Sequence, residues 1–400
     1  MPNSTMQPII SPVGREFLRL HLVPDVGAIL ARRLLDYFGG PAEIFTASRA
    51  ALQRVDKVGP KVADSIFKGV RSDRADVETD RAGKLGIRIV CIEDPDYPAP
   101  LKNINDPPIC LFVRGHWEPQ DAVAVAIVGT RRCSHYGREQ AIRFGRALSA
   151  AGFTVVSGLA RGIDGFAHRG ALQGGGRTVA VLGGGLASIY PVEHESLADE
   201  IAAGRGALIS EYAVDCAPVA GNFPQRNRII TGLSLGVLVV EAGRRSGACI
   251  TARLASEYNR ELFAIPGRID QPEMTAGVNA LIRDAQAKLI TGIDDILDEF
   301  GEVGDIMRGA ASAGSRDEHA RGDGGEQVLG AGKPAPRPRL APHEHAVYSS
   351  VVGGEESAER ISNKTHLSMG QVTSTLTSLQ LKGLVRCLPG SRFVPRKAGM

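Results

Sequence analysis

The sequence has few of the features that mark secreted, membrane or metal-binding proteins. Its six cysteines form no C-x-x-C pair, which disfavours a zinc ribbon or a redox dithiol, so we expect free thiols. It contains no uninterrupted apolar run of about 18 residues, and residues 1–5 show no basic leader, so we expect a cytoplasmic protein without a membrane span. Neither sign of charge dominates, because 47 basic residues oppose 44 acidic ones. This balance neither requires nor excludes a nucleic-acid partner.

The common motifs of nucleotide, metal and hydrolytic chemistry are also missing. No G-x-x-x-x-G-K-[ST] occurs, the nine histidines include no H-E-x-x-H, and no G-x-S-x-G nucleophile elbow or Cys/His arrangement can be defended. Gly183-Gly184-Gly185 lacks the third spaced glycine of a dinucleotide-binding turn. The sequence therefore shows no catalytic residue, and we expect neither an enzyme nor a bound cofactor or metal ion.

A diverged repeat marks the first segment of the chain. Residues 23–28 and 55–60 each place a glycine just before a helix-favouring stretch. This pattern predicts two helix–glycine hairpin–helix units, in which the glycine lets helix N-terminal amides approach a phosphate. The alternative is a small helical bundle whose glycines only cap helices. We assign residues 1–75 to an all-α helix-hairpin-helix (SAM-like) domain.

Short apolar runs alternate with amphipathic segments over residues 76–300. The apolar runs are expected to be parallel strands buried on both faces, at residues 122–128, 153–156, 178–182, 207–209, 237–240 and 262–265. Helical patterns separate them, at residues 138–151, 165–173, 193–203 and 250–258. This alternation predicts an α/β fold, an extended Rossmann-like, doubly wound and mostly parallel sheet.

The composition changes again near the C-terminus. Gly, Pro and Ala fill 20 of the 42 positions at 301–342, which predicts a flexible linker. Apolar periodicity returns at 343–400, where Val372, Leu376 and Leu379 share one helical face ahead of a short strand and a Pro389-Gly390 turn. Helices followed by a small hairpin predict a winged-helix domain.

The loops that follow the expected strands carry the most distinctive residues. In open α/β sheets, ligands bind beyond the carboxyl ends of the strands. The first strand runs into Gly129-Thr130-Arg131-Arg132 ahead of a helix, which would combine a tight turn, guanidinium groups and helix amides as an anion site. Further candidates from the second, third and fifth loops are Ser157, Gly158, Arg161, Gly184, Arg245 and Ser246. Asp164 is expected to cap the following helix rather than to act as an acid.

An aromatic residue stands beside two arginines and an asparagine at residues 222–230. Phe223, Arg226, Asn227 and Arg228 are the types that stack on bases and hold phosphates. In the alternative interpretation, Phe223 belongs to the core and Arg228 pairs with a glutamate, Glu211 or Glu241.

These loops together resemble one family, the DprA/Smf DNA-processing proteins of bacteria. The resemblance spans about residues 86–298, and its motifs are Gly129-Thr130-Arg131, Tyr136-Gly137, Ser157-Gly158-Leu159-Ala160-Arg161-Gly162-Ile163-Asp164, Ala167-His168, Tyr190-Pro191, Ile209-Ser210-Glu211, Phe223-Pro224-Gln225-Arg226-Asn227-Arg228, Val240-Glu241-Ala242, Ser246-Gly247, Thr251-Ala252 and Pro266-Gly267. Two positions depart from the pattern. Ala220 stands where some members have a lysine, and residues 284–287 lack the usual Gly-Ala.

The resemblance implies a function that is not enzymatic. A member of this family is expected to bind single-stranded DNA as a homodimer, through its Rossmann-like domain, and to protect incoming strands. It is further expected to help load the RecA recombinase during natural transformation. Arg131 would be the leading phosphate contact and Phe223 a base-stacking residue. Arg226, Arg228 and Arg245 would add positive charge.

Two other classes of function remain open. The related phosphoribohydrolases hydrolyse nucleoside monophosphates with a P-G-G-x-G-T-x-x-E signature, which supplies a phosphate loop and a catalytic glutamate. The nearest segments here, Glu241-Ala242-Gly243 and Pro266-Gly267-Arg268, lack it. A scaffold that only holds protein partners is the third possibility, and a gel shift with a single-stranded oligonucleotide would separate it from the first.

Overall fold

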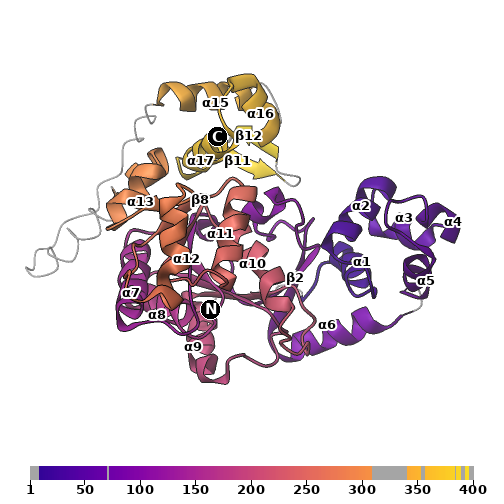
Figure 1. Ribbon diagram of the computed structural model, residues 1–400. Helices are drawn as coiled ribbons and strands as arrows, with labels where there is room; N and C mark the ends of the chain where they lie inside the picture. The colour runs from indigo at the N-terminus through magenta and orange to yellow at the C-terminus, as the bar shows by residue number, and fades with distance from the viewer. Residues whose placement is uncertain are drawn as a thin grey trace, which may run out of the picture.

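The computed structural model describes residues 9–69, 72–308, 340–352, 356–382, 384–388 and 392–395. Figure 1 shows a lobe of N-terminal helices beside a central α/β domain, with a small C-terminal domain against the latter. No helix within these described residues is both long and apolar enough to cross a membrane.

The N-terminal lobe is built from six helices. They are α1 (Pro12–His21), α2 (Ala28–Phe38), α3 (Pro41–Thr46), α4 (Arg49–Leu52), α5 (Pro60–Gly69) and α6 (Arg74–Lys84). Ser11 and Ser48 cap α1 and α4 through their hydroxyl groups, and Gly39 ends α2 with a φ of 88°. Gly27 and Gly59 directly precede α2 and α5. Because α6 continues to Lys84, the expected domain boundary at residue 75 falls inside a helix.

The central domain holds a sheet of nine strands. Their bounds are β1 (Ile87–Cys91), β2 (Cys110–Gly115), β3 (Ala124–Val128), β4 (Thr154–Ser157), β5 (Thr178–Leu182), β6 (Gly206–Ser210), β7 (Gly236–Val239), β8 (Glu261–Ala264) and β9 (Lys288–Leu289). The order is β1-β2-β6-β5-β4-β3-β7-β8-β9, in which β2 pairs antiparallel with both β1 and β6 and every other neighbouring pair is parallel. The expected doubly wound, mostly parallel sheet is confirmed.

Helices cover both faces of this sheet. They are α7 (His135–Ala150), α8 (Ile163–Gln173), α9 (Glu195–Glu200), α10 (Asn222–Gly232), α11 (Gly247–Glu257), α12 (Pro272–Arg283) and α13 (Ile293–Glu299). Alternate residues of β3 point to opposite faces: Val125 and Ile127 pack with α7, α8 and α13, whereas Ala124 and Ala126 pack with α10 to α12. Burial on both faces explains why the strands are continuously apolar in the sequence.

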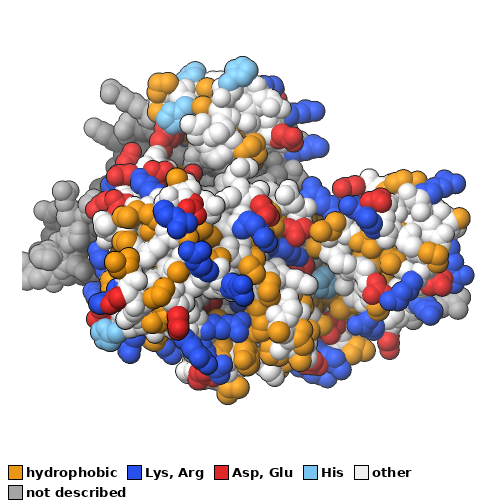
Figure 2. Space-filling model, in the orientation of Figure 1, with side chains coloured by type: hydrophobic (Ala, Val, Ile, Leu, Met, Phe, Trp, Pro, Cys, Tyr) orange, Lys and Arg blue, Asp and Glu red, His pale blue; other side chains and the backbone are white. Residues whose placement is uncertain are grey.

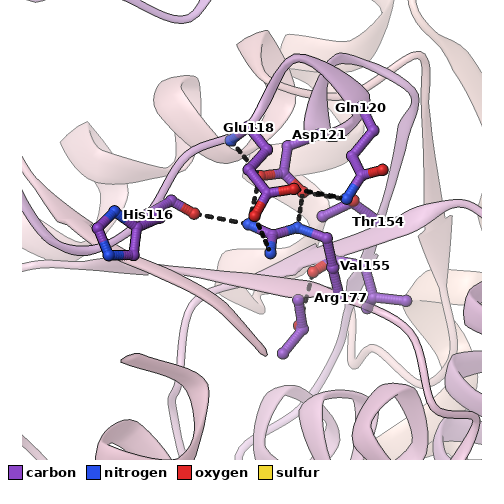
Figure 3. Close-up of polar contacts among 8 residues, drawn as sticks. His116, Glu118, Gln120, Asp121, Thr154, Val155 and Arg177 are labelled. Atoms are coloured by element: carbon purple, nitrogen blue, oxygen red, sulfur yellow. Dashed lines mark hydrogen bonds and ion pairs between the residues drawn. The ribbon is translucent and has the colours of Figure 1, made fainter. Parts of the chain in front are cut away.

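An arginine-centred network closes the amino ends of the central strands (Figure 3). Arg177, next to β5, contacts the Asp121 carboxylate through Nε at 2.8 Å and the Glu118 carboxylate through Nη1 at 2.9 Å. Its Nη2 donates to the carbonyl oxygen of His116 at 2.6 Å, and the Thr154 hydroxyl donates to Asp121 at 2.7 Å. The network ties the segment before β3 to β4 and β5.

The central domain continues past the expected start of the linker. Residues 302–308 form a further helical segment, in which Val303 and Met307 are buried against α7 and α13. Residues 309–339, the rest of the expected linker apart from its last three residues, lie outside the described residues.

The C-terminal domain has the expected winged-helix architecture. Helices α15 (Pro342–Val352), α16 (Ala358–Thr365) and α17 (Met369–Leu381) pack with the strands β10 (Glu356–Ser357), β11 (Val385–Leu388) and β12 (Arg392–Pro395). Val372, Leu376 and Leu379 are all buried on one face of α17, as the periodicity predicts. Nε2 of His343 lies 2.9 Å from a carboxylate oxygen of Glu302, which links this domain to the end of the central domain.

Candidate nucleic-acid interface

A cleft of about 450 Å³ lies at the carboxyl edge of the sheet, beside β3 and β7. The chain leaves β3 toward β4 on one side and later returns to β7 on the other, so this is the point where the strand order reverses. In doubly wound sheets such a switch point opens a crevice for ligands. The cleft brings together most of the residues expected at the site, namely Gly129, Thr130, Arg131, Arg132, Phe223, Arg226, Asn227 and Ser246.

Arg131 and Phe223 form the accessible centre of the cleft. The guanidinium carbon of Arg131 lies 4.7 Å from the centre of the Phe223 ring, a cation–π distance. Within the described residues, no carboxylate lies within ion-pair distance of Arg131, so its charge remains available to a ligand. The Phe223 ring is half-buried and rests on Gly183, where a Cβ would lie 3.0 Å from it. Phe223 therefore packs partly against the protein interior and partly exposes its ring to the cleft.

The cation–aromatic contacts continue beyond the cleft. The Tyr190 and Phe223 rings lie 6.0 Å apart, and Arg161 lies 5.7 Å from the Tyr190 ring. Arg161 is exposed and pairs with Glu193, so it stands at the rim rather than inside. Tyr190 belongs to the Tyr190-Pro191 motif, and the sequence signal for its place in the site is an aromatic residue in a loop that follows a strand.

Arg226 lies beneath the cleft and is not a surface contact. Its side chain is 3% exposed, donates through Nη1 to the Val181 carbonyl and rests against Gly158, where any Cβ would overlap the guanidinium. Burial lowers the pKa of Arg226 to about 10, with the nearby Asp164 carboxylate opposing this shift. Within the described part of the chain, its Nε has no hydrogen-bond partner. Arg226 therefore places positive charge in the floor, and Gly158 makes room for it.

The expected role of Asp164 as a helix cap is wrong. Helix α8 begins at Ile163 with Gly162 at its N-cap, in a backbone conformation of φ 75° that favours glycine. Asp164 lies in the first turn, and its carboxylate accepts from the amide of Ala160 at 3.4 Å. Burial raises its pKa, while Arg226 favours the charged form.

Arg228 does not belong to the cleft. It pairs with Glu211 at 2.6 Å and with Asp106 at 3.2 Å, on the opposite side of α10 from Arg226. Residues 222–232 form a helix, and positions two apart on a helix do not share a face. Arg226 and Arg228 therefore point to different sides of α10. The alternative interpretation, a pair with Glu211, is the correct one.

The expected phosphate site at the start of α7 is already occupied by a carboxylate. Glu241 accepts from the backbone amide of Ser134 at 2.9 Å, and from its hydroxyl group, while that hydroxyl oxygen caps the amide of Gly137 at 3.0 Å. The Ser134 and Gly137 amides are therefore not available to a phosphate near Arg131. The same contacts hold Glu241 in a structural position, which disfavours it as a catalytic glutamate.

Two other helices offer free N-termini to the cleft. Helices α10 and α11 begin beside it, after Gly221 and Ser246, and neither N-cap residue makes a side-chain capping hydrogen bond. Asn227 ties the two helices together by donating to the carbonyl oxygen of Gly247 at 3.3 Å. Uncapped first-turn amides attract anions. In α10, Pro224 has no N–H and the Asn222 amide donates to the Val219 carbonyl oxygen, while in α11 the Cys249 amide donates to the Ser246 carbonyl oxygen. The amides of Phe223, Gly247 and Ala248 remain for an anion beside the cleft.

The remaining expected site residues have supporting positions. The Ser157 hydroxyl is buried and donates to the Ile127 carbonyl at 2.6 Å, so it links β4 to β3. Gly184 packs against the backbone at Pro218. Arg245 is exposed in the loop before α11, next to Ser246.

Together, the switch-point cleft and the C-terminal domain define an extended Rossmann-like protein with a winged helix. Residues 88–301 match the family model described as DNA recombination-mediator protein A, and residues 331–391 match the DprA winged helix domain. The chain therefore belongs to the DprA/Smf family of DNA-processing proteins, as the sequence motifs predicted.

Individual relatives cover different shares of the chain. Protein Smf of Synechocystis sp. is 35% identical over 94% of this chain and 96% of its own length. The DNA processing protein DprA of Bacillus subtilis is 40% identical over 54% of this chain and 72% of its own. The X-ray structure of DprA from Streptococcus pneumoniae superposes with a TM-score of 0.61 at 34% identity, over 71% of this chain and 95% of that one.

Proposed function

We propose that this protein binds single-stranded DNA in the switch-point cleft, protects incoming strands and helps load RecA recombinase on them during natural transformation. The observation that carries the proposal is the pairing of Arg131 with Phe223 in front of two uncapped helix N-termini. The family description as a recombination mediator supports the RecA step. The role is one of binding rather than catalysis.

In this proposal, different groups bind the phosphates and the bases of the strand. Arg131 and the first-turn amides of α10 and α11 hold phosphates, while the Phe223 ring accepts a base from an unpaired strand. Arg132 and Arg245 add charge at the rim, where Arg161 is paired with Glu193. None of these contacts distinguishes one base from another, since every base has a face that can stack.

Competition binding tests this function directly. The protein is titrated with a labelled oligothymidine and then challenged with unlabelled mixed-sequence single strands or with duplex. We expect single strands of any base order to compete equally and duplex to compete poorly, because paired bases cannot reach Phe223. Strong competition by duplex, or marked dependence on base order, would contradict the proposal.

The finer parts of the proposal have their own measurements. A homodimer formed through the Rossmann-like domain predicts twice the chain mass by light scattering, also for a chain that ends at residue 308. Loading of RecA predicts faster RecA-driven ATP hydrolysis on strands coated with single-strand-binding protein. A cytoplasmic location is part of the same proposal, because RecA acts there.

We further propose that the winged-helix domain is not required for single-strand binding. The winged-helix domain offers little to a phosphate backbone, since α17 contains no lysine or arginine. A chain that ends at residue 308 keeps the buried Val303 and Met307, so it is expected to fold and to bind oligothymidine like the parent. Loss of binding by this folded fragment would refute the proposed division.

A further inference from the structure

A second hollow, of about 850 Å³, lies between the N-terminal lobe and the central domain. The start of α2 forms one wall, with Gly27, Ala28 and Ile29, and α11 forms another, with Ile250 and Leu254. Ile29 is 57% exposed in spite of its apolar side chain. We call this hollow the interdomain groove. Exposed apolar surface beside a cavity is typical of a binding site.

The floor of the interdomain groove holds a buried arginine with spare hydrogen-bonding capacity. Arg228 is 8% exposed and pairs with Glu211 and Asp106, yet its Nη1 has no hydrogen-bond partner in the described part of the chain. His21 contacts the Glu211 carbonyl oxygen through Nε2 at 2.7 Å, and burial lowers the pKa of His21. The imidazole is therefore neutral near pH 7, and the floor charge comes from the arginine and two carboxylates.

The rim of the interdomain groove is basic. Arg33, Lys57, Arg74 and Arg253 line it. Asp56 pairs with Arg33 at 2.7 Å and Glu257 with Arg253 at 3.4 Å, so Lys57 and Arg74 carry the rim charge that no carboxylate of the described residues neutralises. Figure 2 shows basic side chains on both lobes near the line where they meet. Helix α2 also begins at the groove with Gly27 as an N-cap that makes no side-chain hydrogen bond. The lining thus complements an anionic ligand that carries apolar surface.

The interdomain groove and the switch-point cleft share a wall. Pro224, in the first turn of α10, lines both, with Phe223 on the side of the cleft and Gln225 on the side of the groove. A strand whose base lies on Phe223 therefore reaches the groove by crossing this single turn of helix.

We propose that the interdomain groove receives the continuation of the single-stranded DNA bound in the cleft. The strand would place bases against Ile29 and Leu254 and phosphates near Lys57 and the start of α2. The inference rests on the proposed function of the cleft and extends its footprint to the N-terminal lobe. Apolar walls favour unstacked bases over duplex, whose bases are covered.

Oligothymidines of two lengths test this footprint. A strand of about 6 nucleotides fills the cleft alone, whereas one of about 20 also reaches the interdomain groove. Lys57→Gln is expected to leave the short strand unaffected and to flatten the salt dependence for the long strand by about 0.7, the contribution of one phosphate contact. Ile29→Asp, at an exposed position, should remove most of the extra affinity of the long strand.

Lys84→Gln is the matched control, because Lys84 is an exposed lysine on α6 of the same lobe outside the groove. Circular dichroism verifies that each variant is folded. If folded Lys57→Gln and Ile29→Asp bind the long strand like the parent, or weaken only duplex binding, the inference is overturned. Failure of the cleft itself looks different, because the parent would then not bind the short strand either.

Discussion

Arg177 and Arg131 stand at opposite ends of the same parallel strands and have opposite surroundings. Arg177, at the amino ends, is bound by Asp121, Glu118 and a carbonyl oxygen, and its side chain is 13% exposed. Arg131, at the carboxyl ends, is exposed and faces an aromatic ring. Carboxylates neutralise the charge of Arg177, and these contacts hold strands together. The charge of Arg131 remains available to a ligand.

Arg226 and Arg228 show what lies between these extremes. Both are buried on α10, but Arg228 has two carboxylate partners, whereas Arg226 has a carbonyl oxygen and the field of Asp164. Burial lowers the pKa of Arg226 to about 10, so it remains charged at pH 7. The carboxyl edge therefore keeps positive charge in both its floor and its surface, while the amino edge neutralises its arginine.

The largest effect, a loss of stability, is expected from a substitution that breaks the Arg177 network at the amino ends of the strands. Arg177→Ala leaves Asp121 buried without its counter-charge, and removal of one partner of a buried ion pair costs about 3–5 kcal/mol of stability. Urea unfolding measures this loss. The control is Arg146→Ala, which removes an exposed arginine of α7. Equal stability of the two variants would show that the network does not hold the strands.

A smaller effect, on binding rather than on stability, is expected at the carboxyl edge. Phe223→Ala removes the stacking surface and should weaken single-strand binding by about 1–3 kcal/mol. Phe166→Ala is the matched control, since Phe166 also lies under an arginine, Arg138 at 5.0 Å, but outside the cleft. Fluorescence anisotropy with oligothymidine compares them. Equal weakening by both variants would remove Phe223 from the site.

The strands are predictable from the sequence, but the burial and the partners of the charged side chains are not. Continuous apolar runs place β3 to β8 within two residues, because burial on both faces leaves few polar positions. The segment 222–232 gave no clear helical signal, so Arg226 and Arg228 could not be assigned to opposite faces. The contact between Glu241 and Ser134 joins positions 107 apart and has no local signature.

The sequence correctly places the glycine-containing loops at the site. The role it predicts for the loop after β3 differs from the one in the structure. The sequence predicts that the turn after β3 offers the amides of α7 to a phosphate. Instead, Gly137 makes room for the carboxylate of Glu241, where a Cβ would lie 2.3 Å from an oxygen. Helices α10 and α11 also begin at the cleft without a side-chain cap, and only the three-dimensional structure brings their N-termini there.

The central claim is that Arg131 meets a phosphate while Phe223 meets a base. The most direct test measures oligothymidine affinity against salt concentration for the parent, Arg131→Ala and Phe223→Ala. We expect Arg131→Ala to flatten the logarithmic salt slope by about 0.7, and Phe223→Ala to weaken binding with the slope unchanged. A folded Arg131→Ala protein with the affinity and salt slope of the parent would contradict the account.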